Sequence, residues 1–367
     1  MLFQWYLFVF LMILYVFAKT ANQQYKVYAA GEYEIRYKRF TAMAVVAVLS
    51  YVAATRHPNF IDTRSYYNHY MREAGTWESI VNIYNGNGKD KAFYIFTAAL
   101  KAILGDRVQM YFGIVAAVPL LCLMAVYRKH SCNFFISVFL FLAGGDYVQW
   151  SHNGIRQFIA VGITFAAMDL LLQRKLLRYW IVVAVASLFH GTALIMIPVS
   201  IVVLGKPWGK LMVLFMAAVC IAGSSLDSLM SAITSLMENT QYANDVDDLM
   251  ATGGTNVIRV LVFCIPPLMA LLFRRQITQL NVPIINLAVN MSVVSMGVYI
   301  ISMFTSGIYI ARLPIYFSLF NYMLLPWMIE RFFEKNSAKL VYLALIACYM
   351  GFYYYQMHIV WGAVTAL

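Results

Sequence analysis

The sequence is divided by long runs of apolar residues, and these runs limit the folds that the chain can adopt. A helix that crosses a bilayer needs about 20 mostly apolar residues, because the hydrocarbon core is about 30 Å thick. Lipid offers no hydrogen-bond partner to an open backbone, so helix is expected for each run. The runs predict an all-α fold, a polytopic transmembrane helical bundle with about 11–12 membrane segments, some of them broken or re-entrant. They cover residues 2–18, 40–55, 108–127, 133–148, 154–172, 179–204, 211–226, 257–273, 284–304, 309–329 and 339–358.

The scarcity of charge agrees with a membrane location. Of the 367 residues, 62% are hydrophobic and only 12% are charged. A soluble domain carries about 25% charged residues. A water-soluble fold of this size could not cover its surface with so few charges, so lipid is expected to be part of the solvent. We predict one integral membrane domain over residues 1–367, with the first run kept as a span and not removed as a signal peptide.

Several partner classes are not indicated. The net charge of +11 comes from 27 Lys and Arg against 16 Asp and Glu. Basic residues in cytoplasmic loops explain this excess, so nucleic acid is not expected as a partner. The five cysteines have no C-x-x-C spacing and predict neither a zinc site nor a disulfide framework. No metal and no cofactor is expected.

The charges of the loops predict the orientation. Residues 19–39 carry five basic and two acidic side chains, whereas 224–256 carry five acidic and no basic ones. Basic loops stay in the cytoplasm, so 19–39 is expected there and 224–256 outside. Residues 56–107 form the second long extracytoplasmic loop, in which the amphipathic segment 92–104 is expected to lie at the interface.

One run cannot cross the membrane once. Lys206 and Lys210 also favour the cytoplasm, so the run 179–204 is expected to enter and return. It has a natural break at His190 and Gly191. Non-helical backbone at membrane depth is tolerated where it lines a protein-walled cavity. His190 is therefore expected to face such a cavity.

The first outer loop has the composition of a sugar-binding surface. It mixes carboxylate, guanidinium and aromatic side chains, and such rings pack on the apolar faces of sugars while polar groups bind hydroxyls. Tyr and Trp are also common anchors at the membrane interface, so composition alone leaves both interpretations open. The candidate sugar-binding residues here are Asp62, Arg64, Tyr66, Tyr67 and Tyr70.

Ionisable residues within the apolar runs are the strongest functional candidates. Arg156 follows Asn153 and precedes Gln157 near an outer helix end; it either snorkels to the surface or forms an anion site with the helix start. His190 is either a hydrogen-bonded packing residue or a general base.

Two further arginines lie close to expected outer helix ends. Arg312 is the only charged residue between 276 and 329, and Arg259 is a weaker candidate at the start of its run. Arginine binds two phosphate oxygens at once, which lysine cannot do.

Four short segments resemble the EpsG family of membrane proteins. Their order covers roughly residues 55 to 330. Around Lys91 the chain departs from the acidic, proline-containing segment that the family often has. The segments are Asp62-Thr63-x-x-Tyr66-Tyr67-x-x-Tyr70, Asn153-x-Ile155-Arg156-Gln157, Leu188-Phe189-His190-x-Thr192-Ala193-Leu194 and Arg312-Leu313-x-x-Tyr316-Phe317.

The resemblance implies a Wzy-type polymerase of capsule, exopolysaccharide or O-antigen synthesis, a multi-pass protein of the bacterial inner membrane. Such a glycosyltransferase joins oligosaccharide repeats carried on undecaprenyl pyrophosphate and needs no metal. By similarity to O-antigen ligases, Arg156 and Arg312 would bind the pyrophosphate and His190 would act as the base. The outer loop, with Asn153, Gln157, Arg259 and Tyr316, would bind the substrate. Membrane lipid and a chain-length regulator protein are the other implied partners.

Two other functions would also place cationic groups in a membrane cavity. A transporter or flippase for lipid-linked sugars would show inverted repeats and paired broken helices, and the sequence has one broken segment without a convincing repeat. A membrane O-acyltransferase would also use an intramembrane His. It would need a donor site at the cytoplasmic side, whereas the His and Arg residues here are expected near the outer face.

The orientation can be tested by cysteine labelling. We expect both termini and residue 240 outside and residue 24 inside, because basic loops are retained in the cytoplasm. A membrane-impermeant thiol reagent should therefore label a cysteine at 240 and spare one at 24. The reverse pattern would overturn the predicted orientation.

Overall fold

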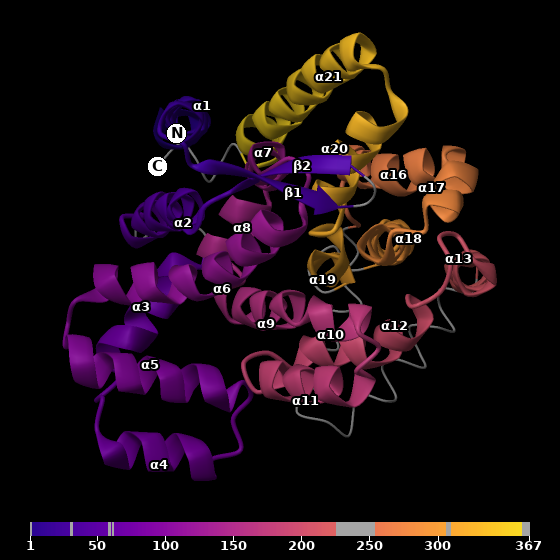
Figure 1. Ribbon diagram of the computed structural model, residues 1–367. Coiled ribbons are helices and arrows are strands. Elements are labelled where there is room, and N and C mark those ends of the chain that lie inside the picture. The colour runs from indigo at the N-terminus through magenta and orange to yellow at the C-terminus, as the bar shows by residue number, and fades with distance from the viewer. Residues whose placement is uncertain are drawn as a thin grey trace. The chain divides into compact units, whose positions relative to one another are not determined.

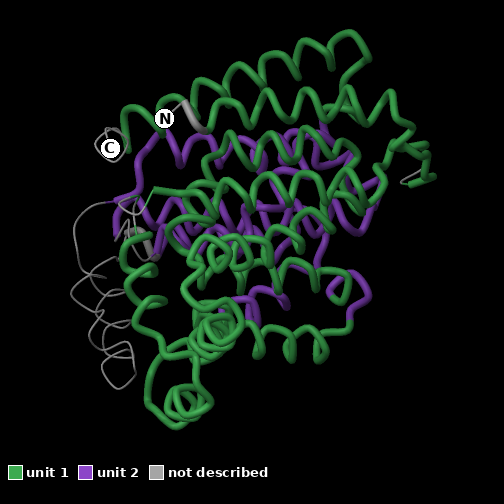
Figure 2. Tube along the Cα trace, turned by 90° about the vertical axis from the view of Figure 1, so that its left-hand side faces the viewer, with its two compact units in different colours: residues 1–170, 175–194, 329–367 green, residues 171–174, 195–328 purple. Residues whose placement is uncertain are grey.

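The computed structural model describes residues 2–29, 32–57, 60, 62–224, 254–305 and 310–361 (Figure 1). The chain divides into two compact units, coloured separately in Figure 2. Unit 1 comprises residues 1–170, 175–194 and 329–367, and unit 2 comprises 171–174 and 195–328. Most of the predicted outer loop 224–256 lies outside the described residues.

Unit 1 is built from helices and one short hairpin. The helix α10 (Met168–Leu172) and the 3₁₀ helix η1 (Gly191–Ile195) run from unit 1 into unit 2. The other elements are α1 (Leu2–Thr20), β1 (Gln24–Ala29), β2 (Glu32–Tyr37), α2 (Arg39–Ala54), α3 (Thr63–Arg72), α4 (Trp77–Asn85), α5 (Lys91–Leu104), α6 (Val108–His130), α7 (Phe134–Ala143), α8 (Asp146–His152), α9 (Ile155–Ala166), α11 (Leu176–Ser187), α21 (Lys335–Tyr354) and the π-helix η4 (Tyr355–Val360).

Unit 2 is helical throughout its described residues. Its longest helix is α18, which begins at a proline, a residue favoured in the first turn because its missing N–H is not needed there. The elements are α12 (Met196–Val202), α13 (Lys210–Ser224), α16 (Val257–Leu272), α17 (Arg274–Leu280), α18 (Pro283–Ser302), the 3₁₀ helix η3 (Ile310–Arg312), α19 (Ile315–Ser318) and α20 (Asn321–Phe332), which ends in unit 1.

The structure is that of a polytopic helical membrane protein. Among the described residues, four helices are long and apolar enough to cross a bilayer. The number of candidate spans rises to six if each of two bent helix pairs is counted as one span. Five shorter apolar helices coincide with other predicted runs. The four are Val108–His130, Ile155–Leu172, Pro283–Ser302 and Lys335–Val360, and the shorter ones are Gln4–Thr20, Arg39–Ala54, Leu176–Ser187, Gly191–Val202 and Lys210–Ile221.

The predicted break in the run 179–204 is present. α11 ends at Ser187, and the 3₁₀ helix η1 begins at Gly191. His190 lies in the connection, where its backbone N–H donates to the Ala186 carbonyl at 3.1 Å. The break thus places the His190 ring at the end of a helix and not along its side.

Three predicted segments are different in the structure. The run 133–148 bends by 67° between α7 and α8, where Gly145 has a φ of 80°. The run 309–329 is not a continuous span, because Pro314 lacks an N–H and separates η3 from α19, and α20 follows as a third piece. The segment 56–107, predicted as an extracytoplasmic loop with an amphipathic part at 92–104, contains the helices α3, α4 and α5.

The loop 19–39 contains an antiparallel hairpin that the sequence analysis did not predict. Gln24 of β1 pairs with Tyr37 of β2. The guanidinium of Arg36 is buried, donating to the Ser131 carbonyl and pairing with Glu34. This arginine joins the hairpin to the turn between α6 and α7. The alternating sequence of β2, Glu32–Tyr37, is typical of a strand, but hydropathy alone does not detect so short an element.

An apolar cluster in unit 1 holds α3, α5, α6 and α9 together. Tyr70 of α3 stacks on Tyr111 of α6 with ring centroids 4.2 Å apart. Phe93 of α5 and Ile159 of α9 are buried in the same cluster. Since α3 and α5 belong to the segment predicted as a loop, this packing turns that segment into a fixed part of the unit.

α6 and α9 approach closely because Gly162 of α9 lies against Pro119 of α6. A Cβ atom added to Gly162 would lie 2.7 Å from the Pro119 Cα, a backbone atom that cannot rotate away. Small residues at helix contacts are a common device in membranes, where they allow backbones to approach.

Replacing Gly162 by alanine should therefore destabilise the protein. We expect a loss of about 1–3 kcal/mol from overpacking, which exceeds the gain of about 0.5–1 kcal/mol from replacing a helical glycine. Gly351→Ala in α21 is the matched control, since a Cβ there would meet no atom within 4 Å. Thermal unfolding in detergent should show a lower Tm for Gly162→Ala alone. Equal Tm values would show that α6 and α9 separate freely.

Candidate functional site

Asp90 binds two of the residues that the sequence analysis selected. Its Oδ2 accepts a hydrogen bond from the Arg156 Nη1 at 2.7 Å and lies 3.2 Å from the His190 Nδ1. Its side chain is 6% exposed, against 30% for Arg156 and 23% for His190. A buried carboxylate is therefore balanced by one cation and a histidine, each of which keeps an accessible edge.

The backbone holds Asp90 in an unusual conformation. It precedes α5 with a φ of 55°, in the left-handed region that few residues other than glycine, Asn and Asp adopt. Its side chain makes no capping hydrogen bond to α5, although an aspartate cap contributes about 0.5–2 kcal/mol. The carboxylate instead faces Arg156 and His190. The backbone conformation of Asp90 thus directs its carboxylate to these two residues instead of to the N-terminus of α5.

A backbone hydrogen bond brings His190 to Asp90. The Ala92 N–H at the start of α5 donates to the Leu188 carbonyl after α11 at 3.0 Å. Because a carboxylate can only accept, the His190 Nδ1 carries the proton in this pair. The Nε2 atom then has the lone pair. The arrangement leaves a histidine nitrogen that can take a proton from a ligand.

Arg156 is the second residue of α9 and lies in the first turn of that helix. Its Nη1 also donates to the Tyr94 hydroxyl at 3.3 Å, and its side chain hydrogen-bonds to Tyr66. Gly154 precedes α9 because a Cβ there would lie 2.7 Å from the Trp150 ring. A carboxylate and two phenols thus surround the guanidinium at the N-terminus of α9. This end of a helix carries the positive partial charge of the helix dipole.

Burial controls the ionisation of the aromatic residues on α3. It raises the pKa of Tyr66, while the charge of Arg156 and their hydrogen bond lower it. Burial also lowers the pKa of His69. The positive charge of Arg156 lowers this pKa further, whereas the carboxylate of Glu73 raises it. The His69 ring also packs against Tyr94, with centroids 4.8 Å apart. These shifts favour a neutral phenol and a neutral imidazole beside the Arg156 cation.

A second arginine belongs to the same part of unit 1. Arg56 lies over the Phe112 ring at 4.1 Å, and its Nε donates to the Ala53 carbonyl at 2.7 Å. Burial lowers its pKa to about 10, and it interacts electrostatically with Tyr66. Its Nη2 is buried with no hydrogen-bond partner among the residues that the structure describes.

The remaining candidates in unit 1 differ in accessibility. Tyr70 is fully buried, its hydroxyl donates to the Gly105 carbonyl, and its ring packs on Tyr111, so it is a core residue that a sugar cannot reach in this conformation. Gln157 is also buried. Tyr67 and Asn153 are half-buried, while Asp62 and Arg64 are exposed at the start of α3.

Arg259, Arg312 and Tyr316 belong to unit 2. Arg259 is buried in the first turn of α16, with its guanidinium 5.3 Å from the centre of the Phe263 ring. Arg312 is half-buried at the end of η3, and Tyr316 is buried in α19. Their joint action with Arg156 stays a prediction.

Asp90, Tyr94 and Arg56 were missed as site residues. Asp90 lies two residues before the amphipathic segment 92–104 that the sequence analysis placed at the interface, next to the departure at Lys91. An acidic residue there is the signal that could have been used. Within the described residues, no group of three or more His, Cys, Asp or Glu side chains could hold a metal ion.

Comparison with known proteins decides the family. The EpsG family model matches residues 39–362, which include every element from α2 to η4 and the residues Asp90, Arg156 and His190.

The chain belongs to the EpsG family.

No curated protein matches the chain, and no solved structure does. Membership of the EpsG family suggests a membrane protein of polysaccharide biosynthesis that handles lipid-linked saccharides. The matched residues include all three parts of the chain that form the Asp90 site, namely the start of α5, the start of α9 and the end of α11.

Removing the Asp90 carboxylate should destabilise this EpsG-family protein. Asp90→Ala leaves the partly buried Arg156 without its counter-charge, and we expect a loss of about 1–3 kcal/mol in the free energy of unfolding. Asp106→Ala is the control, because Asp106 pairs with Lys101 at 2.6 Å but is 77% exposed, and exposed pairs contribute about 0–1 kcal/mol. The double variant Asp90→Ala with Arg156→Leu should recover part of the loss. Equal Tm values for Asp90→Ala and Asp106→Ala would contradict a structural role for the buried pair.

Proposed function

We propose that this EpsG-family protein is a polysaccharide polymerase that joins undecaprenyl-pyrophosphate-linked oligosaccharide repeats at the outer face of the bacterial inner membrane. The observation that carries the proposal is the single carboxylate of Asp90 bound to both Arg156 and His190. One cation and one oriented base, both partly accessible, are the two groups that transfer from a lipid-pyrophosphate donor requires.

The reaction forms one glycosidic bond and breaks one bond to phosphate. A sugar hydroxyl of the acceptor attacks the anomeric carbon of the donor, and its proton passes to the His190 Nε2. The bond between the anomeric carbon and the pyrophosphate oxygen breaks, and the electron pair leaves with the lipid pyrophosphate. Negative charge grows on that oxygen, so a fixed guanidinium stabilises the transition state more than the ground state.

Arg156 is the proposed partner of the leaving group. Its guanidinium is held by Asp90 and Tyr94 and keeps part of its surface exposed. Bidentate binding of phosphate oxygens needs the planar fork of arginine. Arg312 of unit 2 is proposed to contact the same pyrophosphate, with Arg259 in support.

Asp90 is proposed to position both groups. Its hydrogen bond to the His190 Nδ1 fixes the tautomer in which the Nε2 is basic. It also balances the histidine when the proton arrives, as a carboxylate does for an imidazolium in other nucleophilic sites. Because it also accepts from Arg156, an incoming pyrophosphate competes with it for the guanidinium.

The saccharide is proposed to lie along α3. Tyr66 and Tyr67 offer ring faces, and Asp62 and Arg64 offer polar groups at the exposed start of that helix. Asn153, Gln157 and Tyr316 are the further proposed contacts, and a chain-length regulator is the proposed protein partner.

Polymer formation by the purified protein tests the function. With a lipid-pyrophosphate-linked repeat as the substrate, His190→Gln should lower turnover by about 10²–10⁴-fold, since glutamine can hydrogen-bond to Asp90 but cannot take the proton. His130→Gln is the matched control, because His130 also pairs with an aspartate, Asp169, at 2.9 Å but belongs to α6. Near-normal polymer from His190→Gln would make His190 a packing residue.

The same assay tests the arginines. Arg156→Lys and Arg312→Lys each keep a positive charge but lose the planar fork, so both should lose most of their activity. Normal polymer from both would indicate snorkelling or charge balance. If the wild-type protein instead moves the lipid-linked repeat across vesicles without joining repeats, it is a flippase.

A further inference from the structure

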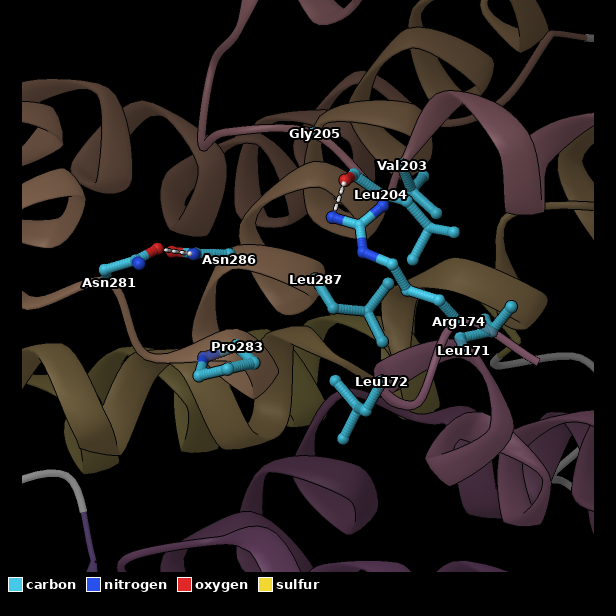
Figure 3. A pocket seen from close by; sticks show the side chains of 10 residues that line it. All are labelled: Leu171, Leu172, Arg174, Val203, Leu204, Gly205, Asn281, Pro283, Asn286 and Leu287. Atoms are coloured by element: carbon cyan, nitrogen blue, oxygen red, sulfur yellow. Dashed lines mark hydrogen bonds between the residues drawn. The ribbon is translucent and has the colours of Figure 1, made fainter. Parts of the chain in front are cut away.

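Unit 2 contains a cavity of about 240 Å³, in which the ends of several helices meet (Figure 3). α10 ends at Leu172 and α17 at Leu280, and α18 begins at Pro283. The apolar side of the cavity includes Leu171, Leu172 and Leu287, and its polar side includes Arg174, Asn281 and Asn286. None of these residues belongs to the Asp90 site, so the polymerase proposal leaves this cavity without a role.

Arg174 brings a positive charge into the cavity. Its Nη2 donates to the Leu204 carbonyl at 3.1 Å, and no other hydrogen bond of its guanidinium is recorded among the described residues. Figure 3 shows the guanidinium among the lining side chains, beside Leu204. Most of its fork of donors is therefore available to a ligand, and that fork matches the oxygens of a phosphate group.

Two amides form the opposite wall. The Asn286 Nδ2 donates to the Asn281 Oδ1 at 2.9 Å (Figure 3). The Asn286 Oδ1 is buried and has no hydrogen-bond partner among the described residues. An acceptor buried without a donor costs about 1–3 kcal/mol, and a ligand hydroxyl or amine would remove that cost.

The charges that the structure describes in unit 2 favour an anionic ligand. Among its described residues, unit 2 contains no Asp and no Glu, so no carboxylate there could balance a cation. The charge that the structure describes in unit 2 is therefore basic. The basic residues of this part of the chain are Arg174, Lys206, Lys210, Arg259, Arg274, Arg275 and Arg312.

The size and the lining together select the ligand. The cavity of about 240 Å³ opens to the surface at the exposed residues Arg174 and Asn281, and it has room for a phosphate with a small attached group. A free phosphate would gain nothing from the leucine wall. An amphiphile would place its polar group on Arg174 and its glycerol carbons on Leu171 and Leu287.

We propose that this cavity binds the headgroup of an anionic phospholipid, with the phosphate on Arg174 and a headgroup hydroxyl on Asn286. Helix ends of a polytopic protein lie near the membrane interface, where headgroups are found. Basic loops are retained in the cytoplasm, so the loops that carry Arg174 and Arg274 are expected at the cytoplasmic leaflet, where anionic lipids concentrate. The site does not depend on the polymerase activity.

Lipid retention by the purified protein tests the site. Native mass spectrometry of protein exchanged into detergent with phosphatidylglycerol or phosphatidylcholine measures the bound lipid. Wild-type protein should retain one phosphatidylglycerol. Arg174→Gln should lower its retention by about tenfold or more, as expected for a charged hydrogen bond. Glutamine is two atoms shorter than the arginine fork and loses the bond to the Leu204 carbonyl, so thermal unfolding must show that Arg174→Gln stays folded.

Two further variants separate the site from general charge and from folding. Arg275→Gln removes the same charge from an exposed position of α17 that does not line the cavity, and it should retain lipid like the wild type. Asn286→Asp keeps the side-chain shape but adds a negative charge, and it should release the lipid while the protein stays folded by thermal unfolding.

Several results would overturn the proposal. Equal losses in Arg174→Gln and Arg275→Gln would show that surface charge alone attracts the lipid. Equal retention of phosphatidylcholine would exclude an anionic headgroup site. A rise in Tm with inorganic phosphate alone, absent in Arg174→Gln, would assign the cavity to a soluble phosphate compound instead of a lipid.

Discussion

A buried carboxylate holds the candidate site of unit 1 together. An ionised side chain within a membrane protein is costly unless a partner neutralises it, and Asp90 has both Arg156 and His190 bound to one oxygen. The partners lie 66 and 100 residues away along the sequence. The start of α5, the start of α9 and the end of α11 must therefore meet at this oxygen. The left-handed backbone of Asp90 and the absence of a side-chain cap on α5 follow from the same requirement.

The apolar runs predicted the helices well because the constraint behind them is simple. Lipid requires internal hydrogen bonding, so a long apolar run becomes a helix wherever it lies. The bends were harder to predict. Gly144 and Gly145 allow a sharp turn within an apolar run, and hydropathy averages such a turn away. The segment 56–107 was read as a loop because its helices carry aromatic and polar residues. Tyr70 and Phe93 nonetheless bury α3 and α5 against α6 and α9.

Two of the three residues that meet at the Asp90 oxygen were selected from the sequence. Arg156 and His190 stood out because ionisable groups are rare in apolar runs. Asp90 did not, since an aspartate in a polar segment has no distinguishing pattern, and its partners are set by a backbone contact between Ala92 and Leu188. Tyr70 has the composition of a sugar-binding residue but the environment of a core residue. Residue type alone cannot separate these roles, because a tyrosine ring packs equally well on a sugar or on another tyrosine.

The shared oxygen of Asp90 has a consequence for exchanging segments between relatives. A chimera that imports residues 56–107 from another family member brings in its own α5 start, while α9 and α11 remain from the host. Such a chimera should assemble when the donor segment supplies an acidic residue directly before α5 with a backbone that tolerates the left-handed conformation. The overall sequence similarity between the imported and the original segment should matter less than this acidic residue. The proposed saccharide specificity of α3 would then be transferred with the segment. The position of one acidic residue before α5 would decide whether the chimera folds.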